Sequence, residues 1–95
     1  MKKKQSHLRK ERRSKLDIYF DILYAIQQEQ TKEGVKPTII QYKSGMSYDK
    51  ITKHLAALQE KKLVSKKQYY HITEKGHIFL TEYSMIKEFV EKMDL

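Results

Sequence analysis

The 95-residue sequence contains no cysteine, and none of its hydrophobic runs approaches the ~20 residues that a membrane-spanning helix needs. The lack of cysteine excludes disulfides, cysteine–zinc sites and thiol catalysis, and it suits a reducing cytosol. The basic N-terminus is not followed by an apolar segment, so we expect no signal peptide. The length allows a single domain with one modest core. We therefore expect a cytoplasmic protein without a membrane partner.

Motifs for catalysis and cofactor binding are also missing. The four histidines, His7, His54, His71 and His77, have no metal-ligand spacing and no cysteine partners. The three glycines do not form a phosphate-binding loop. We therefore expect no enzyme activity, no metal or other cofactor, and no small-molecule ligand.

Acidic residues are scarce in two segments, so the net charge of +8 is unevenly distributed. Residues 1–13 carry seven Lys or Arg against one Glu, and residues 32–67 carry nine Lys against three acids. Residues 14–31 and 68–95 are each slightly acidic. Lysines that served only solubility would be spread more evenly. This concentration of positive charge indicates a polyanion-binding protein.

The first basic segment, residues 1–13, has too few apolar side chains to order itself, and we interpret it as a flexible arm. It contains every arginine of the chain, Arg9, Arg12 and Arg13. Such an arm could reach DNA phosphates or a minor groove, or it could act only as a solubilising terminus. The sequence favours neither interpretation.

The residues from Ser14 to Asp17 resemble a capping box, and the apolar residues after them recur at helical spacing. We expect this first helix to end near Glu29 or Gln30, before a polar stretch that ends at Gly34. Its apolar arc is too wide for one groove. The helix should therefore also contact a second surface, either the C-terminal helix of its own chain or a partner.

A short second helix is predicted from Pro37 to Ser44, with Pro37 in its first turn. We expect Ile39 and Ile40 on its inner face, and Tyr42 is a further candidate for that face. The next residue, Gly45, can adopt the positive φ that closes a turn.

The stretch from Gly45 to Leu63 predicts a longer third helix with Ser47 as its N-cap. Its two faces differ in character. We expect Tyr48, Ile51, Leu55, Leu58 and Lys62 to face the core, and Asp49, Lys50, Lys53, Ala56 and Ala57 to lie on the opposite side. A short helix, a turn and a longer helix constitute a helix-turn-helix, and a polar, lysine-bearing face suits the DNA major groove.

Two short strands are predicted at residues 63–65 and 69–72. The basic hairpin that they form would be the wing of a winged helix-turn-helix. Thr73 can then cap a final helix from Glu74 to about Met93. The fold class is therefore mainly α with a short β-hairpin.

The final helix carries apolar residues in an a/d pattern, at Phe79, Tyr83, Ile86, Val90 and Met93. We interpret this seam as the interface of a homodimer. The alternative is that the helix folds back on the first helix and completes a monomeric core. The expected parts of the chain are a basic arm (1–13), a winged helix-turn-helix (14–73) and a C-terminal dimerisation helix (74–95).

Four motifs carry a family resemblance over roughly residues 14–90. They are Ser14-Lys15-Leu16-Asp17-Ile18-Tyr19, Tyr42-Lys43-Ser44-Gly45-Met46-Ser47-Tyr48-Asp49, Leu58-Gln59-Glu60-Lys61-Lys62-Leu63-Val64 and Tyr70-His71-Ile72-Thr73-Glu74-Lys75-Gly76. The chain resembles small archaeal winged helix-turn-helix proteins, among which are nucleoid-associated proteins and regulators of archaea and their viruses. In that family the C-terminal helices pair as an antiparallel coiled coil, which implies the same role for the a/d seam here. Many relatives have Gly where this chain has Lys62.

The residues that we expect to contact DNA lie on the recognition helix, the wing, the second helix and the arm. They are Ser47, Tyr48, Lys50, Lys53 and His54; Lys66, Lys67 and Gln68; Thr38, Tyr42 and Lys43; and Arg9, Arg12 and Arg13. The recognition helix contains no arginine, so the common Arg–guanine contact is missing. We expect modest sequence specificity and strong salt dependence.

We interpret the chain as a nucleoid-associated homodimer that binds double-stranded DNA in a sequence-dependent way and regulates transcription. Two alternatives are a non-specific nucleoid protein and a winged helix that contacts other proteins. RNA binding is a third, because charge alone does not exclude it. A protein-binding helix would more often expose an apolar patch, which Ala56 and Ala57 are too small to supply.

Overall fold

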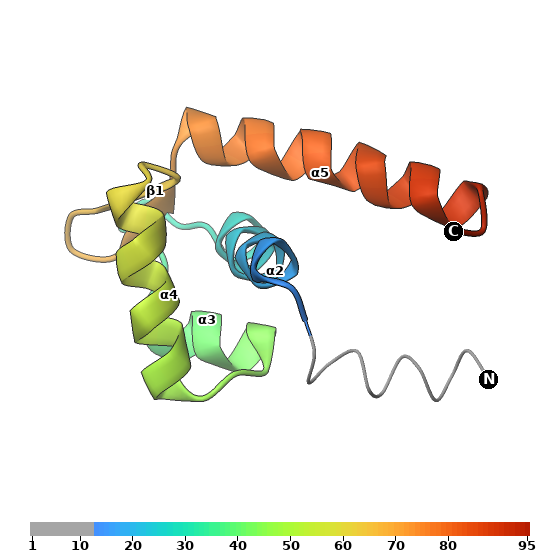
Figure 1. Ribbon diagram of the computed structural model, residues 1–95. Coiled ribbons are helices and arrows are strands. Elements are labelled where there is room, and N and C mark those ends of the chain that lie inside the picture. Colours follow the sequence, from blue (N-terminus) through green and yellow to red (C-terminus); the bar gives the residue numbers. More distant parts are fainter. Residues whose placement is uncertain (1–12) are drawn as a thin grey trace.

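In a computed structural model of the protein, the structure describes residues 13–95 (Figure 1). These residues form mainly α-helices, with one antiparallel two-stranded hairpin between the last two helices. This arrangement confirms the predicted fold class of a winged helix-turn-helix with a long C-terminal helix. The elements in chain order are α2 (Lys15–Gln28), α3 (Pro37–Ser44), α4 (Tyr48–Glu60), β1 (Val64–Lys66), β2 (Tyr70–Ile72) and α5 (Glu74–Lys92).

Helix α2 is the central helix of the fold, and it packs against α3, α5 and β2. Ile22, Leu23 and Ile26 of this helix are fully buried. Its N-cap was predicted correctly, because the Ser14 hydroxyl accepts a hydrogen bond of 3.1 Å from the Asp17 amide. The expected second contact surface is α5 of the same chain. The helix ends slightly earlier than predicted.

Helix α3 has a narrower buried face than the sequence suggested. Ile40 is fully buried, as predicted, and Ser44, one turn later, is also buried. The inward placement of Ile39 and Tyr42 was wrong, because their side chains are 38% and 82% exposed. A helix this short has room for only one row of core positions at i and i+4. The predicted turn is present, since Gly45 has a φ of 70° and its amide donates to the Gln41 carbonyl.

Helix α4 buries three residues predicted for its core face, Ile51, Leu55 and Leu58. The predicted N-cap also forms, because the Ser47 hydroxyl accepts from the Lys50 amide at 3.4 Å. Three placements differ from expectation. Ala57 packs against the core instead of joining the polar face, Tyr48 is 46% exposed, and Lys62 is exposed beyond the end of the helix.

The hairpin pairs Val64 with Ile72 and Lys66 with Tyr70. Val35 extends it through an isolated antiparallel bridge to Tyr70, with hydrogen bonds of 2.8 Å and 3.1 Å between the two backbones. This bridge explains why a glycine, Gly34, precedes Val35. Gly34 has a φ of 101°, and a Cβ there would lie only 2.9 Å from the Tyr70 carbonyl oxygen.

Helix α5 begins at its predicted N-cap, because the Thr73 hydroxyl accepts from the Gly76 amide at 3.0 Å. A Cβ on Gly76 would lie 2.4 Å from the Leu63 carbonyl oxygen, so glycine permits the close approach of α5 to the hairpin. Leu80 is buried, whereas the C-terminal half of α5 extends beyond the rest of the molecule (Figure 1).

Two residues of the predicted dimer seam contact their own chain. Phe79 packs against the core, and Tyr83 stacks on Phe79 and lies beside Phe20 of α2, with ring centroids 5.3 Å and 5.6 Å away. The first half of α5 therefore folds back on α2, as in the alternative interpretation. The other seam residues, Ile86, Val90 and Met93, are exposed.

Candidate nucleic-acid interface

The outer face of α4 carries the largest group of the residues predicted to contact DNA. Ser47, Tyr48, Lys50 and Lys53 are all exposed on it. The three fully buried residues of α4 hold the opposite face against the core, so the helix presents its polar side to solvent. A helix with free lysines on a solvated face can enter a major groove and reach phosphates or base edges.

His54, also predicted to contact DNA, lies at the flank of α4 that faces α2. Its ring meets Tyr19 of α2 edge-on, with centroids 6.1 Å apart and planes at 79°. Burial lowers the pKa of His54 below its usual value, and the nearby positive charges of Lys53 and Lys15 lower it further, with Lys50 and Arg13 adding to the effect. The imidazole is therefore neutral in the free protein at neutral pH.

The predicted contacts on α3 are at its surface. Thr38, Tyr42 and Lys43 are exposed. The ammonium of Lys43 lies 3.3 Å from a carboxylate oxygen of Glu29, which follows α2. A phosphate that approached Lys43 would compete with this surface ion pair, which is worth little in water.

The tip of the hairpin carries the predicted wing residues, and Lys66, Lys67 and Gln68 are all exposed. The Lys67 amide donates to the Tyr69 carbonyl at 3.1 Å, which closes a turn that contains neither Gly nor Asn. The ammonium of Lys66 lies 5.3 Å from the ring centroid of Tyr70, and Lys36 lies 5.6 Å from that of Tyr69. Tyrosine faces thus support two lysines of the wing region.

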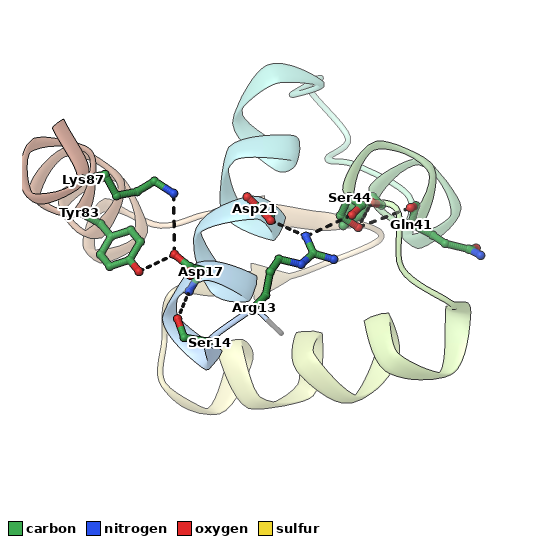
Figure 2. Close-up of polar contacts among 9 residues, drawn as sticks. Arg13, Ser14, Asp17, Asp21, Gln41, Ser44, Tyr83 and Lys87 are labelled. Carbon is green, nitrogen blue, oxygen red and sulfur yellow. Dashed lines mark hydrogen bonds and ion pairs between the residues drawn. The ribbon is translucent and has the colours of Figure 1, made fainter. Parts of the chain in front are cut away.

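Arg13 was predicted to belong to the arm, but it contacts the folded part of the chain. Its guanidinium forms an ion pair with Asp21 of α2 and lies 3.5 Å from the Ser44 carbonyl at the end of α3 (Figure 2). Arg13 therefore links α2 to the helix-turn-helix. The other two predicted arm residues, Arg9 and Arg12, lie outside the described residues.

Two lysines at this surface were missed by the sequence analysis. Lys36 lies beside the wing, and Lys15 lies close enough to His54 to affect its pKa. Lys36 falls in the basic segment 32–67, so the charge pattern could have pointed to it. Lys15 stands in an acidic segment, and only the approach of α2 to α4 at Tyr19 and His54 brings it to the site.

Two further searches concern metal sites and membrane-spanning helices. Residues 13–95 contain no group of three or more His, Cys, Asp or Glu side chains placed to hold a metal ion. Over the same range, no helix has the length and apolar character needed to cross a membrane.

The sequence was compared with known proteins. A search of curated proteins finds no match. A family model described as a winged helix-turn-helix matches residues 12–91, which is most of the chain. The archaeal subgroup, the nucleoid role and the coiled coil stay predictions. The match and the architecture agree, and the chain belongs to the winged helix-turn-helix family.

Proposed function

We propose that the protein binds double-stranded DNA, with α4 in the major groove and the wing against the neighbouring backbone. The observation that carries this proposal is the exposure of Lys50 and Lys53 on the solvated face of α4. The hairpin that follows α4 packs against it and adds Lys66 and Lys67 at its tip. Cationic side chains on both elements are what contact with the phosphates on either side of a groove requires.

The chemistry of these contacts supports modest sequence specificity. Lysine binds phosphates and guanine edges as a point charge, without the two-pronged geometry of arginine. The short side chains of Thr52 and Ala56 on the exposed face allow α4 to approach the bases. We therefore propose a transcriptional regulator of the nucleoid that reads a short, degenerate site. Non-specific nucleoid binding is the second candidate, which the absence of arginine from α4 favours.

A homodimer formed through α5 is the second part of the proposal. The helix leaves a stripe of large apolar side chains in solvent, consisting of Ile78, Met85, Ile86, Phe89, Val90 and Met93, each 38% to 58% exposed. A continuous exposed apolar stripe of this kind marks an interaction surface. The a/d spacing of its inner edge suits a second helix. In such a dimer, α5 would contact both α2 of its own chain and its symmetry mate.

The experiment that tests DNA binding is fluorescence anisotropy of the full chain with random duplex DNA across a salt series. The test variant combines Lys50→Ala with Lys53→Ala. The matched control combines Lys32→Ala with Lys92→Ala, which removes the same charge from a loop and from the end of α5. The slope of log affinity against log salt concentration reports the number of phosphates that the protein neutralises. We expect this slope to fall by about two in the test variant and to stay at the wild-type value in the control.

Equal losses in both variants would mean that net charge, not the recognition helix, drives binding. No binding of the wild type at low salt would leave a protein-interaction winged helix as the better description. Random and operator-selected duplexes then separate a regulator from a nucleoid protein, because only a regulator discriminates between them. A third variant, Arg9→Ala with Arg12→Ala, measures the contribution of the arm.

A further inference from the structure

The N-terminal end of α2 and the flank of α4 bring three lysines close to one neutral histidine. Lys15 comes from α2, and Lys50, Lys53 and His54 come from α4. The rings of His54 and Tyr19 meet edge-on, so this flank of α4 approaches α2 at this point. His54 is half-buried between them, whereas the three lysines are exposed.

The carboxylates of α2 are engaged elsewhere. Asp21 pairs with Arg13, and Asp17 accepts a hydrogen bond from Tyr83 at 2.6 Å and lies 3.7 Å from Lys87 (Figure 2). Within residues 13–95, no ion pair involves the three lysines around His54. Asp49, one turn before Lys53 on α4, forms no ion pair in the same range either, so three lysines stand against one unpaired carboxylate and the surface at the α2–α4 junction keeps a net positive charge.

We propose that Lys15, Lys50, Lys53 and His54 form one phosphate-binding surface beside the recognition helix, and that His54 takes up a proton when DNA occupies it. This inference rests on the proposed DNA binding and extends it in two ways. It adds Lys15 of α2 to the interface. It also makes the affinity of the complex depend on pH.

The proton uptake follows from the surroundings of His54. In the free protein, burial and the cations Lys53, Lys15, Lys50 and Arg13 lower the pKa of its imidazole. A DNA phosphate placed against these cations supplies negative charge that offsets them and favours the imidazolium. Because the bound state then holds more protons than the free state, affinity rises as the pH falls.

The test measures anisotropy with random duplex DNA at low salt, with the full chain, between about pH 7.5 and about pH 6, where histidine titrates. We expect the affinity of the wild type to rise about threefold to tenfold over this range, since one proton gives at most about tenfold per pH unit. His54→Gln keeps a polar side chain but cannot take up the proton, and it should lose most of the rise. His77→Gln, on the far helix α5, should keep it.

The added contact is tested by the salt slope of Lys15→Ala, which should fall by about one relative to wild type, with Lys32→Ala as the control that leaves it unchanged. NMR titration of the His54 ring protons in the unaltered protein, with and without duplex, checks the proton uptake without any substitution. The His54 titration midpoint should rise when DNA is bound.

The outcomes separate this inference from the function on which it rests. If the wild type does not bind duplex DNA at low salt, the proposed function fails. If it binds, but His54→Gln keeps the wild-type pH dependence or the His54 midpoint does not move, the proton-linked site is overturned and DNA binding stands. A wild-type salt slope for Lys15→Ala would remove α2 from the interface.

Discussion

The Tyr83 hydroxyl donates a 2.6 Å hydrogen bond to Asp17, and this bond joins the C-terminal helix to the first turn of α2 (Figure 2). Lys87, one turn after Tyr83, lies 3.7 Å from the same carboxylate oxygen and 5.1 Å from the ring centroid of Phe20. The Ser14 hydroxyl meanwhile caps α2 by accepting from the Asp17 amide. A polar contact thus holds α5 on α2 at the point where the buried part of α5 ends.

Removing this hydrogen bond should destabilise the monomer fold modestly. Tyr83→Phe keeps the ring stacked on Phe79 but removes the hydroxyl, so we expect the free energy of unfolding to fall by about 0.5–1.5 kcal/mol. Urea denaturation followed by circular dichroism measures it. Tyr42→Phe, at a side chain 82% exposed, is the matched control and should leave the midpoint unchanged. Equal midpoints for all three proteins would contradict a stabilising role for the bond.

The same carboxylate should make stability depend on pH. Partial burial alone would raise the pKa of Asp17, but hydrogen bonds from Tyr83 and Ser14 and the charge of Lys87 outweigh burial and lower it. Because the pKa of Asp17 is lowered in the folded state, its carboxylate stabilises the fold at pH values above the unfolded-state pKa of about 3.9. This contribution is lost as the pH falls through the pKa of the folded state. Asp17→Asn should therefore lower the Tm at neutral pH, with a smaller deficit at strongly acidic pH. Thermal scans of both proteins at a series of pH values measure this difference in Tm. A difference that stays constant across the series would refute the prediction.

Lys62, just after the C-terminal end of α4, adopts a backbone conformation that lysine does not favour. Lys62 has a φ of 64°, in the left-handed region. Lys62→Gly should stabilise the protein by about 0.5–1 kcal/mol, because relief of the Cβ strain exceeds the entropy that glycine adds to the unfolded chain. Lys61→Gly, at an ordinary φ of −83°, should instead lower stability. Thermal denaturation of both variants checks the opposite signs.

The proposed dimer depends on the exposed apolar stripe of α5. Ile86→Glu places a charge in this stripe, and we expect it to shift the mass in solution from dimer to monomer. Light scattering after size exclusion measures the mass. Ser84→Glu, which adds the same side chain on another side of the helix, should leave the mass unchanged. A dimeric mass for Ile86→Glu would remove the stripe as the interface.

Local features of the fold were predictable because their causes lie close together in sequence. The hydroxyls of Ser14, Ser47 and Thr73 each accept from an amide three residues later. Gly45 closes its turn with its own backbone torsions. Each of these interactions is complete within one helical turn, so sequence reasoning found the start of every described α-helix to within a residue or two.

Features that depend on a distant element were not predictable in the same way. The pairing of Arg13 with Asp21 and its approach to Ser44 require α2 and α3 to be placed first. An a/d pattern on α5 identifies an apolar seam but not the helix that covers it, so Phe79 and Tyr83 contact α2 of their own chain. Lys15 reaches the candidate interface only because α2 approaches α4 where Tyr19 meets His54. The exposure of the candidate contact residues on α4 and at the wing was therefore predictable, whereas the approach of Lys15 of α2 to them was not.

Helix α2 is held on two sides, by Tyr83 of α5 at Asp17 and by Arg13 at Asp21, next to the end of α3. These two aspartates lie one helical turn apart, so α5 and the helix-turn-helix are attached to adjacent turns of the same helix. In the proposed dimer, a shift of one α5 along the other would therefore carry the attached helix-turn-helix with it. The register of the paired helices would then set how many base pairs separate the two half-sites that one dimer can occupy.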